Sequence, residues 1–553
     1  MRVNLLYRDR DPDRLNGEAY YDPESIIKDL GLERLFLSAG QRVILEHGEV
    51  KLYDKEDPYI SETMRKVMMI PLASAEETVY RQEVMKDCLR QEEILRELYR
   101  ISSETLTKWD VLGRGAREKT QQRNPAVKLT EELLTVQLFC DSLKEIRELF
   151  TWKNPQTGKT PAEECRSEGF RGLYERLCAA FPEERENTVR KVLADVSFFT
   201  DGGDESDPWE QQTLKPRIVL ECGLEDGLKF SSMKLAEVSS EPMRFYRPGT
   251  TMKKLQEFRY SRIPDSFSVE RDMHLNEQAK LLEFGVVSYL KENILGGVLE
   301  EFRPFFDRLK RQTAFYLGAV QLTDHIRSRG MDFCFPEVSD RETLEFRELR
   351  ECVTGLERRV KMIGNTCSLN GERLLIVTGA NQGGKSTFLR SIGIAQVMMQ
   401  SGLPVAAEAF RGGLFPRIFV HFTRREDSSM NSGRLDEELG RMNRIVEQIG
   451  DGSLLLLNES FATTTEKEGS VIAYDIVRAL TEAGAKILMV THLLSFAKRV
   501  YEETKDDPES GAAFLSAERK PDGTRTFRMI RHTPEMTSFG LDLYEEIVEK
   551  KKY

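Results

Sequence analysis

Residues 373–402 limit the possible folds of this chain more than any other stretch. They read RLLIVTGANQGGKSTFLRSIGIAQVMMQSG, which is an apolar run, a glycine-rich turn and then a helical pattern. The turn at residues 379–386 matches the phosphate-loop motif G-x-x-x-x-G-K-[ST] in full. It also lies between a strand and a helix, which is the context that this motif requires. The sequence therefore predicts a P-loop fold.

Each residue type in this loop has a chemical reason. Backbone amides and the N-terminal end of the following helix bind phosphate. Lys385 is expected to neutralise β- and γ-phosphate oxygens, and Ser386 to supply a hydroxyl to Mg²⁺. A side chain at Gly384 is expected to crowd the ligand. The predicted cofactors are ATP or ADP and Mg²⁺, and the predicted binding residues are Gly379, Ala380, Asn381, Gln382, Gly383, Gly384, Lys385, Ser386 and Thr387.

Strands and helices continue to alternate after this loop. The segments that read as strands are residues 416–422, 453–460 and 485–492, and those that read as helices are residues 433–450 and 468–484. Such alternation predicts a parallel sheet with its binding site at the carboxyl ends of the strands. The expected fold of residues 341–553 is therefore an α/β domain with a P-loop.

Polar side chains follow two of the predicted strands. Four leucines at residues 454–457 end in Asn458 and Glu459, where nucleotide hydrolases normally carry Asp-Glu. Glu459 is the predicted general base or water-positioning group, and His492 after the next strand is placed to contact the γ-phosphate. Asn458 can accept a hydrogen bond from a magnesium-bound water, but it lacks the negative charge that Mg²⁺ prefers. Slowed hydrolysis, ordinary turnover and lost chemistry all stay open.

The first half of the chain shows helical periodicity. Ser74 and Glu77 have capping-box spacing at the start of residues 74–106. The apolar stripe predicted for this helix consists of Val79, Val84, Met85, Cys88, Leu89, Ile94, Leu95 and Leu98. Residues 130–150 and 286–329 repeat the pattern, whereas residues 216–238 and 242–255 read as short strands with turns.

Composition sets further limits. A chain of 553 residues suggests several domains. It has no apolar run long enough to span a membrane and no secretory signal. Eight scattered cysteines, none in a C-x-x-C pair, favour reduced thiols in a cytoplasmic protein and argue against zinc. The net charge of −11 gives no global attraction to nucleic acid, so DNA contact would need a local basic surface.

Several segments resemble the MutS family of DNA mismatch-repair ATPases. GLPVAAEAF and RIFVHFTRREDSSMNSGRL are similar to the segment that leads into the family's serine-bearing signature loop. NESFATTTEKEG takes the place of the Asp-Glu stretch, with Thr464 and Gly469 matching, and VTHLLSFA and SFGLDLYEEI resemble later family segments. YRQEVMKDCL, in the helical half, is similar to the start of the family's core domain.

The resemblance implies a nucleotide-operated homodimer with a multidomain fold. Ser432 would reach the partner's γ-phosphate from the start of a helix, which is physically sensible because helix N-termini attract anions. Residues 1–200 would form an all-α core and lever, residues 201–265 a clamp-like insert with short strands, and residues 266–340 further lever and core helices. Residues 341–553 would form an α/β P-loop ATPase domain of the ABC type.

DNA binding would come from basic residues in and after the clamp-like insert. The candidates are Lys215, Arg217, Lys229, Lys234, Arg244, Arg247, Lys253, Lys254, Arg259 and Arg262.

The chain also departs from the family pattern. It begins almost directly with LGLERLFLSAGQ, similar to the core, so the mismatch-reading and connector domains are expected to be absent. The family's C-terminal helix-turn-helix and nuclease segments are likewise not expected. Mismatch repair or related DNA maintenance is the implied process, without direct mismatch reading. Two alternatives stay open: an ATP-gated scaffold that does not hydrolyse, and the same motor acting on structured RNA, a ribosomal surface or a protein.

Overall fold

The computed structural model of this chain forms two compact units. The described residues are 3–8, 19–46, 49–52, 55–118, 125–155, 157–180, 182–184, 186–187, 190, 217–225, 229–239, 296–423, 434–507, 510–520 and 524–534. The helical unit comprises Met1–Val3, Arg100–Ala162 and Leu173–Lys310, and the sheet unit comprises Asn4–Tyr99, Glu163–Gly172 and Arg311–Tyr553. Helices α5 (Glu92–Glu118) and α12 (Gly296–Ser328) contribute residues to both units.

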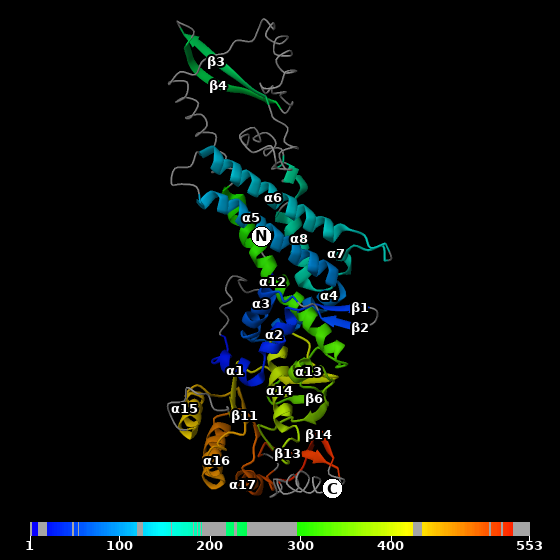
Figure 1. Ribbon diagram of the computed structural model, residues 1–553, viewed down its shortest axis with the longest axis vertical. Coiled ribbons are helices and arrows are strands. Elements are labelled where there is room, and N and C mark those ends of the chain that lie inside the picture. The colour runs from blue at the N-terminus through cyan, green and yellow to red at the C-terminus, as the bar shows by residue number, and fades with distance from the viewer. Residues whose placement is uncertain are drawn as a thin grey trace, which may run out of the picture. The chain divides into compact units, whose positions relative to one another are not determined.

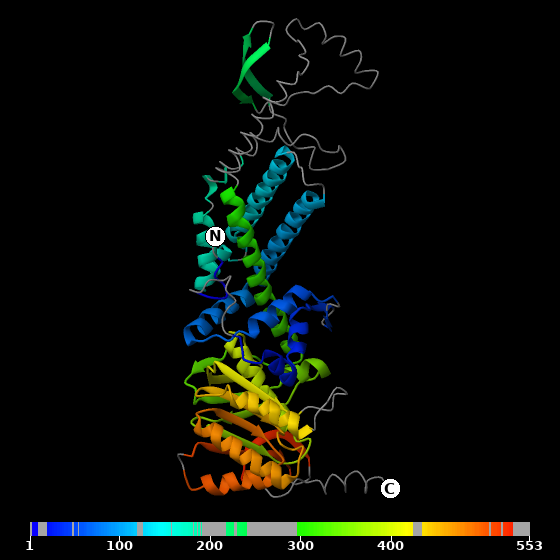
Figure 2. The ribbon, with the colours of Figure 1, turned by 90° about the vertical axis from the view of Figure 1, so that its left-hand side faces the viewer.

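The helical unit has its own apolar core. Helix α6 (Pro125–Thr151) buries side chains three or four positions apart, which is the spacing of one helical face. Phe139 on this face meets Trp109 of α5 edge-on, with ring centroids 4.7 Å apart, and stacks on Phe306 of α12 at 5.4 Å. The three helices lie side by side (Figures 1 and 2). The residues that α6 buries are Val136, Phe139, Cys140, Leu143, Ile146 and Phe150, and α8 (Glu168–Ala180) adds Leu173 and Leu177.

A β-hairpin also belongs to the helical unit. Strands β3 (Arg217–Glu225) and β4 (Lys229–Ser239) pair antiparallel, as expected for residues 216–238. The strands expected at residues 242–255, and the clamp candidates Lys215, Arg244, Arg247, Lys253, Lys254, Arg259 and Arg262, lie outside the described residues.

The N-terminal part of the sheet unit is mostly helical, and three of its helices begin at side-chain caps. Asp22 caps α1 (Pro23–Leu30), Asp57 caps α3 (Pro58–Met68), and Ser74 caps α4 (Ala75–Arg90) by accepting a hydrogen bond from the Glu77 amide at 3.2 Å. Helix α2 (Glu33–Ala39) lies between α1 and α3 in the chain.

This part corrects two expectations. It is not purely helical, because β1 (Val43–Glu46) and β2 (Glu49–Leu52) form an antiparallel hairpin. Residues 74–106 are not one helix, because α4 ends at Arg90 and α5 starts at Glu92. Of the predicted apolar stripe, Val79 is exposed, because α4 buries a different face, whereas Val84, Met85, Cys88, Leu95 and Leu98 are buried.

The main sheet has the order β10-β11-β12-β8-β13-β14. Its first five strands are parallel, and β14 (Arg525–Arg531) pairs antiparallel with β13 (Ala512–Arg519) at the edge. The other strands are β8 (Leu374–Thr378), β10 (Arg417–Phe422), β11 (Ser453–Asn458) and β12 (Lys486–Val490). The predicted parallel sheet is confirmed.

Helices cover both faces of this sheet, which explains why its strands read as continuous apolar runs. On one face, Leu455, Leu457, Ile487 and Met489 pack with residues of α15 (Arg434–Val446), α16 (Glu466–Glu482) and α17 (Leu494–Thr504). On the other face lies α14 (Lys385–Gln400), which contacts β11 and β12. Figure 1 shows α16 and α14 on opposite sides of β11, and Figure 2 shows the orange helices α16 and α17 in front of the strands.

A second sheet, not expected from the sequence, supports the main one. Its order is β5-β9-β6-β7, built from β5 (Glu337–Ser339), β6 (Leu344–Leu349), β7 (Asn365–Ser368) and β9 (Ala409–Gly413). Asn365 joins the two sheets: its Oδ1 accepts from the Met529 amide at 2.8 Å, and its Nδ2 donates to the Phe527 carbonyl at 3.3 Å. Strand β14 is thereby fixed at the mouth of the phosphate loop.

Two further findings concern membrane-spanning helices and the cysteine thiols. Within the described residues, no helix has the length and apolar character needed to cross a membrane. The seven cysteines whose side chains the structure describes are free thiols, and burial raises the pKa of several of them, such as that of Cys140 to about 12. The cytoplasmic location inferred from the thiols stays a prediction.

Candidate active site

The predicted site residues meet at one edge of the main sheet. The register aligns Phe422 with Asn458, Asn458 with Val490, and Val490 with Val377, so four strands end side by side. The phosphate loop leaves β8, Asn458 and Glu459 end β11, and His492 follows β12. The structure therefore brings together the residues that the sequence placed at separate strand ends.

The phosphate loop needs glycine at three positions for two different reasons. Gly379 and Gly384 have left-handed backbones, with φ of 107° and 91°. A Cβ on Gly383 would lie 2.7 Å from the Ala517 Cβ and 3.0 Å from the Ala380 carbonyl oxygen, which is too close. A Cβ on Gly384 would make ordinary contact with Phe527 at 3.5 Å. The conformation of Gly384, and not crowding within the protein, therefore accounts for this glycine.

Lys385 is the charged residue of the phosphate loop, and its side chain is buried and hydrogen-bonded. Only 4% of the residue is exposed, and its Nζ donates to the carbonyl oxygens of Gly379 and Ala380, each at 2.9 Å. Burial lowers the pKa of Lys385 to about 8, although the charge of Glu459 acts in the opposite direction. The side chain is charged at neutral pH and lies where the loop and Glu459 meet.

Glu459 and His492 form a direct pair. Nε2 of His492 and Oε1 of Glu459 are 3.0 Å apart. The hydrogen bond from His492 is the main reason that the pKa of Glu459 is held below its ordinary value, and the charges of His492 and Lys385 add to this against partial burial. Glu459 is therefore an ionised carboxylate at neutral pH, with one oxygen held by His492.

The backbone of Glu459 is also unusual. Its φ is 56°, in the left-handed region that non-glycine residues seldom adopt. Two contacts hold it there: the Glu459 amide donates to the Val490 carbonyl at 2.8 Å, and the Thr423 hydroxyl donates to the Glu459 carbonyl at 2.7 Å. Such a backbone at a strand end is typical of functional sites, because it costs free energy that the surrounding structure must supply.

Asn458 offers an oxygen to a cation. Among the residues that the structure describes, its buried Oδ1 has no hydrogen-bond partner. An amide oxygen without a partner at a strand end, together with the half-buried Ser386 hydroxyl at the start of α14, is a donor set of the oxygen type that Mg²⁺ takes. These donors fit Mg²⁺ held mainly through phosphates, because they supply oxygens but no carboxylate of their own.

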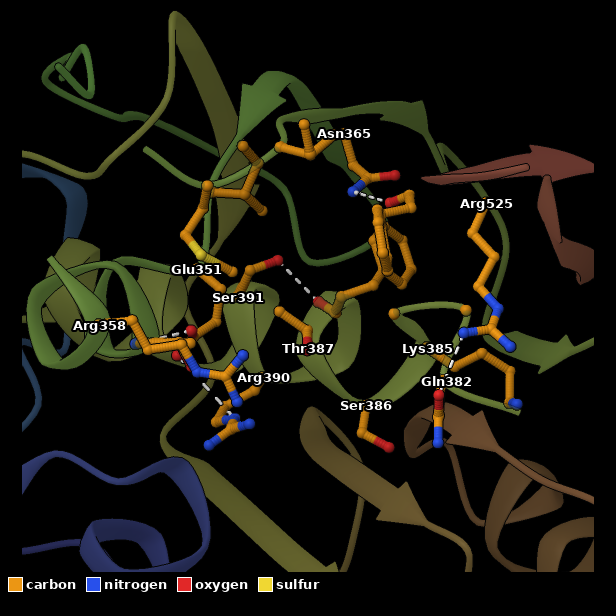
Figure 3. Close-up of a pocket in the computed structure, with 18 of the residues that line it drawn as sticks. Glu351, Arg358, Asn365, Gln382, Lys385, Ser386, Thr387, Arg390, Ser391 and Arg525 are labelled. Atoms are coloured by element: carbon orange, nitrogen blue, oxygen red, sulfur yellow. Dashed lines mark hydrogen bonds and ion pairs between the residues drawn. The ribbon is translucent and has the colours of Figure 1, made fainter. Parts of the chain in front are cut away.

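A cavity of about 630 Å³ lies beside several of these groups, although Asn458 and His492 are not among the residues that line it (Figure 3). Lys385, Ser386, Thr387 and Glu459 line it together with the loop residues Asn381 to Gly384. This volume lies in the range of pockets that hold small molecules and cofactors.

The cavity also contains residues that sequence reasoning missed. Phe527, whose residue is 45% exposed, stands beside Gly384, and Arg525 donates to Gln382 at 3.1 Å. On the far side, Glu351 and Arg390 line the wall, with Oε1 and Nε 3.9 Å apart. In Figure 3, Arg525 and Gln382 lie on one side of Ser386, and Glu351 and Arg390 on the other. Only the position of an aromatic residue in the last strands could have suggested Phe527.

Ser432, the residue expected to act across a dimer, lies outside the described residues. The matching positions Thr464 and Gly469 are described: Thr464 donates to Glu468 at 2.6 Å, and Gly469 packs on the carbonyl of Phe461.

Comparisons with known proteins agree with this geometry. A family model described as MutS domain V matches residues 375–549, and one described as MutS2 N-terminal domain matches residues 73–205. The DNA mismatch repair protein MutS of two strains of Chloroflexus aurantiacus is 28% identical over 210 residues, which cover 37% of this chain and 22% of that protein. The matched region thus spans about one fifth of the length of these curated relatives. The two family matches, which fall on the sheet with its phosphate loop and on the helices before it, show that this chain belongs to the MutS family.

Proposed function

We propose that this chain is a MutS-type ATPase that binds ATP with Mg²⁺ and hydrolyses it slowly in DNA mismatch repair or related DNA maintenance. One observation carries the proposal: Lys385, Ser386 and Glu459 line a single cavity, and Glu459 is held as a carboxylate by His492. A buried cation, a hydroxyl and an oriented carboxylate at a helix N-terminus form the arrangement that phosphoryl transfer to water requires.

The residues of the loop would bind and orient the triphosphate. Lys385 would leave the carbonyls of Gly379 and Ala380 for phosphate oxygens, which raises its pKa and keeps it charged. The amides of the loop and the N-terminal end of α14 would hold the β-phosphate. Phe527, exposed at the mouth, offers an aromatic face to the base, because every base has a π-face that can stack.

The strand-end residues would serve the attacking water. Ser386 and Asn458 would hold Mg²⁺, which neutralises charge on the phosphates when bound. Glu459 would orient the water with its free oxygen, while the oxygen bonded to His492 fixes its direction. Asn458 brings no negative charge, so we infer weaker metal binding and slow turnover.

The partners follow from family membership and stay at the level of a proposal. We infer a homodimer in which Ser432 of each subunit completes the other's nucleotide site. We also infer that the lysine and arginine residues within the clamp-like insert, residues 201–265, contact DNA. Competition binding with duplex, mismatched duplex, branched DNA and structured RNA at two salt concentrations tests the substrate, since phosphate contacts weaken steeply with salt. Preference for RNA would favour the alternative substrate class.

The decisive experiment compares wild type with two variants. Lys385→Ala should lose ATP binding, whereas Glu459→Gln should bind ATP and release no phosphate above background. His532, exposed after β14, provides the matched control as His532→Ala. If wild type and Glu459→Gln release phosphate equally slowly, the protein is a non-hydrolysing ATP-gated scaffold, a reading that Asn458 favours. If Lys385→Ala binds nucleotide like wild type, the proposal is wrong.

A further inference from the structure

The turn that follows Glu459 is strained at a second position. Phe461 has φ of 65°, so two of the three residues after Asn458 lie in the left-handed region without being glycine. Phe461 is fully buried and Ser460 is too. Residues 458–463, which we call the catalytic turn, therefore need strong contacts on both sides to stay in this conformation.

Helix α15 supplies the contacts on one side. Glu438, only 7% exposed, accepts a hydrogen bond from the Phe461 amide through Oε1 at 2.6 Å. Its Oε2 accepts one from the Thr463 hydroxyl, also at 2.6 Å. A single carboxylate thus holds the backbone of one turn residue and the side chain of another, and bonds to a charged acceptor are the stronger kind.

A buried histidine completes the same side. Nδ1 of His421 lies 2.7 Å from the Ser460 hydroxyl, and its Nε2 lies 3.3 Å from the Glu438 carbonyl oxygen. The His421 ring also stacks on Phe461, with centroids 6.0 Å apart. His421 therefore connects α15 to the catalytic turn a second time.

The position of α15 is itself fixed at the carboxyl edge of the sheet. One turn after Glu438, Arg441 donates to the Phe422 carbonyl at 3.0 Å and pairs with Asp29 at 3.2 Å. On the opposite side of the catalytic turn, α16 approaches so closely that a Cβ on Gly469 would lie 2.4 Å from the Phe461 carbonyl oxygen. The turn contacts both helices, and among the described residues it is α15 that holds it through a carboxylate, that of Glu438.

We propose that Glu438 is a positioning residue for ATP hydrolysis: through Phe461 and Thr463 it keeps the catalytic turn, and hence the Glu459 carboxylate, in its working direction. Because α15 carries Glu438, any displacement of this helix is transmitted to Glu459. The chain therefore contains a route by which events at the start of α15 control hydrolysis without a change in nucleotide binding. This inference rests on the proposed ATPase function.

Three variants of the full chain test the proposal. Glu438→Ala removes both hydrogen bonds, Thr463→Val removes one while keeping the shape of the side chain, and Glu438→Gln keeps an oxygen for the Phe461 amide and a polar group for Thr463. Asp436→Ala, an exposed acid on the same helix, is the matched control. For each variant, kcat comes from phosphate release, nucleotide Kd from titration with a fluorescent ATP analogue, and the fold from circular dichroism.

The expected result is a loss in kcat alone. Glu438→Ala should lower kcat by roughly 10- to 100-fold, the range for a misdirected reacting group, with Kd within about threefold of wild type. Thr463→Val should lose less, and Glu438→Gln and Asp436→Ala should stay near wild type. If Glu438→Ala does not fold, Thr463→Val decides.

Two outcomes would overturn the proposal. One is an unchanged kcat in Thr463→Val and in any folded Glu438→Ala. The other is a fall in kcat together with a comparable loss of nucleotide affinity, which would mean that Glu438 only stabilises the fold. Failure of the ATPase function itself looks different, since wild type would then be as inert as Glu459→Gln.

Discussion

Replacing Lys385 by methionine should separate the stability of this protein from its nucleotide binding. Lys385 is buried with its amine on two loop carbonyls. Methionine has nearly the same length and no charge, so it fits the space without the cost of burying a cation. We expect Lys385→Met to lose nucleotide binding and yet to be at least as stable as wild type without nucleotide.

The magnitude follows from the lysine's pKa. Burial lowers it from 10.5 to about 8, and each pKa unit corresponds to about 1.4 kcal/mol. Keeping the amine charged near pH 7 therefore costs about 3 kcal/mol relative to the unfolded chain. Methionine regains this but leaves the Gly379 carbonyl without its lysine donor, at about 1–3 kcal/mol, whereas the Ala380 carbonyl keeps the hydrogen bond from the Gly383 amide. The net gain is about 1 kcal/mol, or roughly 2–4 °C in melting temperature for a domain of this kind.

The pH dependence gives the reasoning a sharper test. A lysine with a lowered folded-state pKa binds its proton less tightly than in the unfolded chain, so wild type gains stability as pH rises from about 8 toward 10.5. The advantage of Lys385→Met should therefore be largest below pH 8 and shrink above it.

Thermal unfolding at several pH values measures this, with Lys498→Met on the surface of α17 as control. In wild type alone, saturating ATP should add about 3 kcal/mol at a hundred times Kd. A Lys385→Met protein that melts several degrees below wild type at neutral pH would refute the argument, because Lys385 would then be a net stabilising group.

Three further changes probe the other site residues. Asn458→Asp should raise kcat and lower the Mg²⁺ concentration for half-maximal hydrolysis by roughly tenfold, the factor that about 1.4 kcal/mol of added attraction gives. If the variant and wild type need the same Mg²⁺ concentration, the missing charge at Asn458 does not limit hydrolysis. His492→Ala should lower kcat and move the acid limb of its pH profile upward, because the pKa of Glu459 is held low mainly by the hydrogen bond from His492; an unmoved limb would remove His492 from this role. Phe527→Ala should weaken ATP binding by roughly 5- to 160-fold, as expected for about 1–3 kcal/mol of lost stacking, and leave tripolyphosphate binding unchanged; equal losses for both ligands would exclude base stacking.

Much of the main sheet could be predicted from the sequence, because local patterns determine it. Buried parallel strands are apolar throughout, the helices between them repeat with the helical period, and each site residue follows a strand end. Asn458, Glu459 and His492 therefore lie near Lys385 for a reason that the sequence already contains: the carboxyl ends of parallel strands share one edge.

Other parts of the site depend on contacts between distant residues. Phe527 reaches the phosphate loop only because β14 reverses direction at the sheet edge and Asn365 of the second sheet holds its backbone. Glu438 reads as one more acid on an amphipathic helix, and nothing in its neighbours marks it as buried. Val79 is likewise exposed because α4 buries a face that includes the polar residues Thr78, Arg81 and Gln82, which an apolar pattern does not mark.

The geometry also bears on whether Asn458 marks a site that has lost its chemistry. A buried lysine amine, left-handed backbones at Glu459 and Phe461, and a buried amide oxygen on Asn458 without a partner among the described residues each cost stability. Random substitution in a site without function relieves such costs easily, since stabilising changes are common and usually neutral. That the site keeps them together, with Glu438 and His492 holding the carboxylate in place, therefore supports the proposed ATPase function over a site without function.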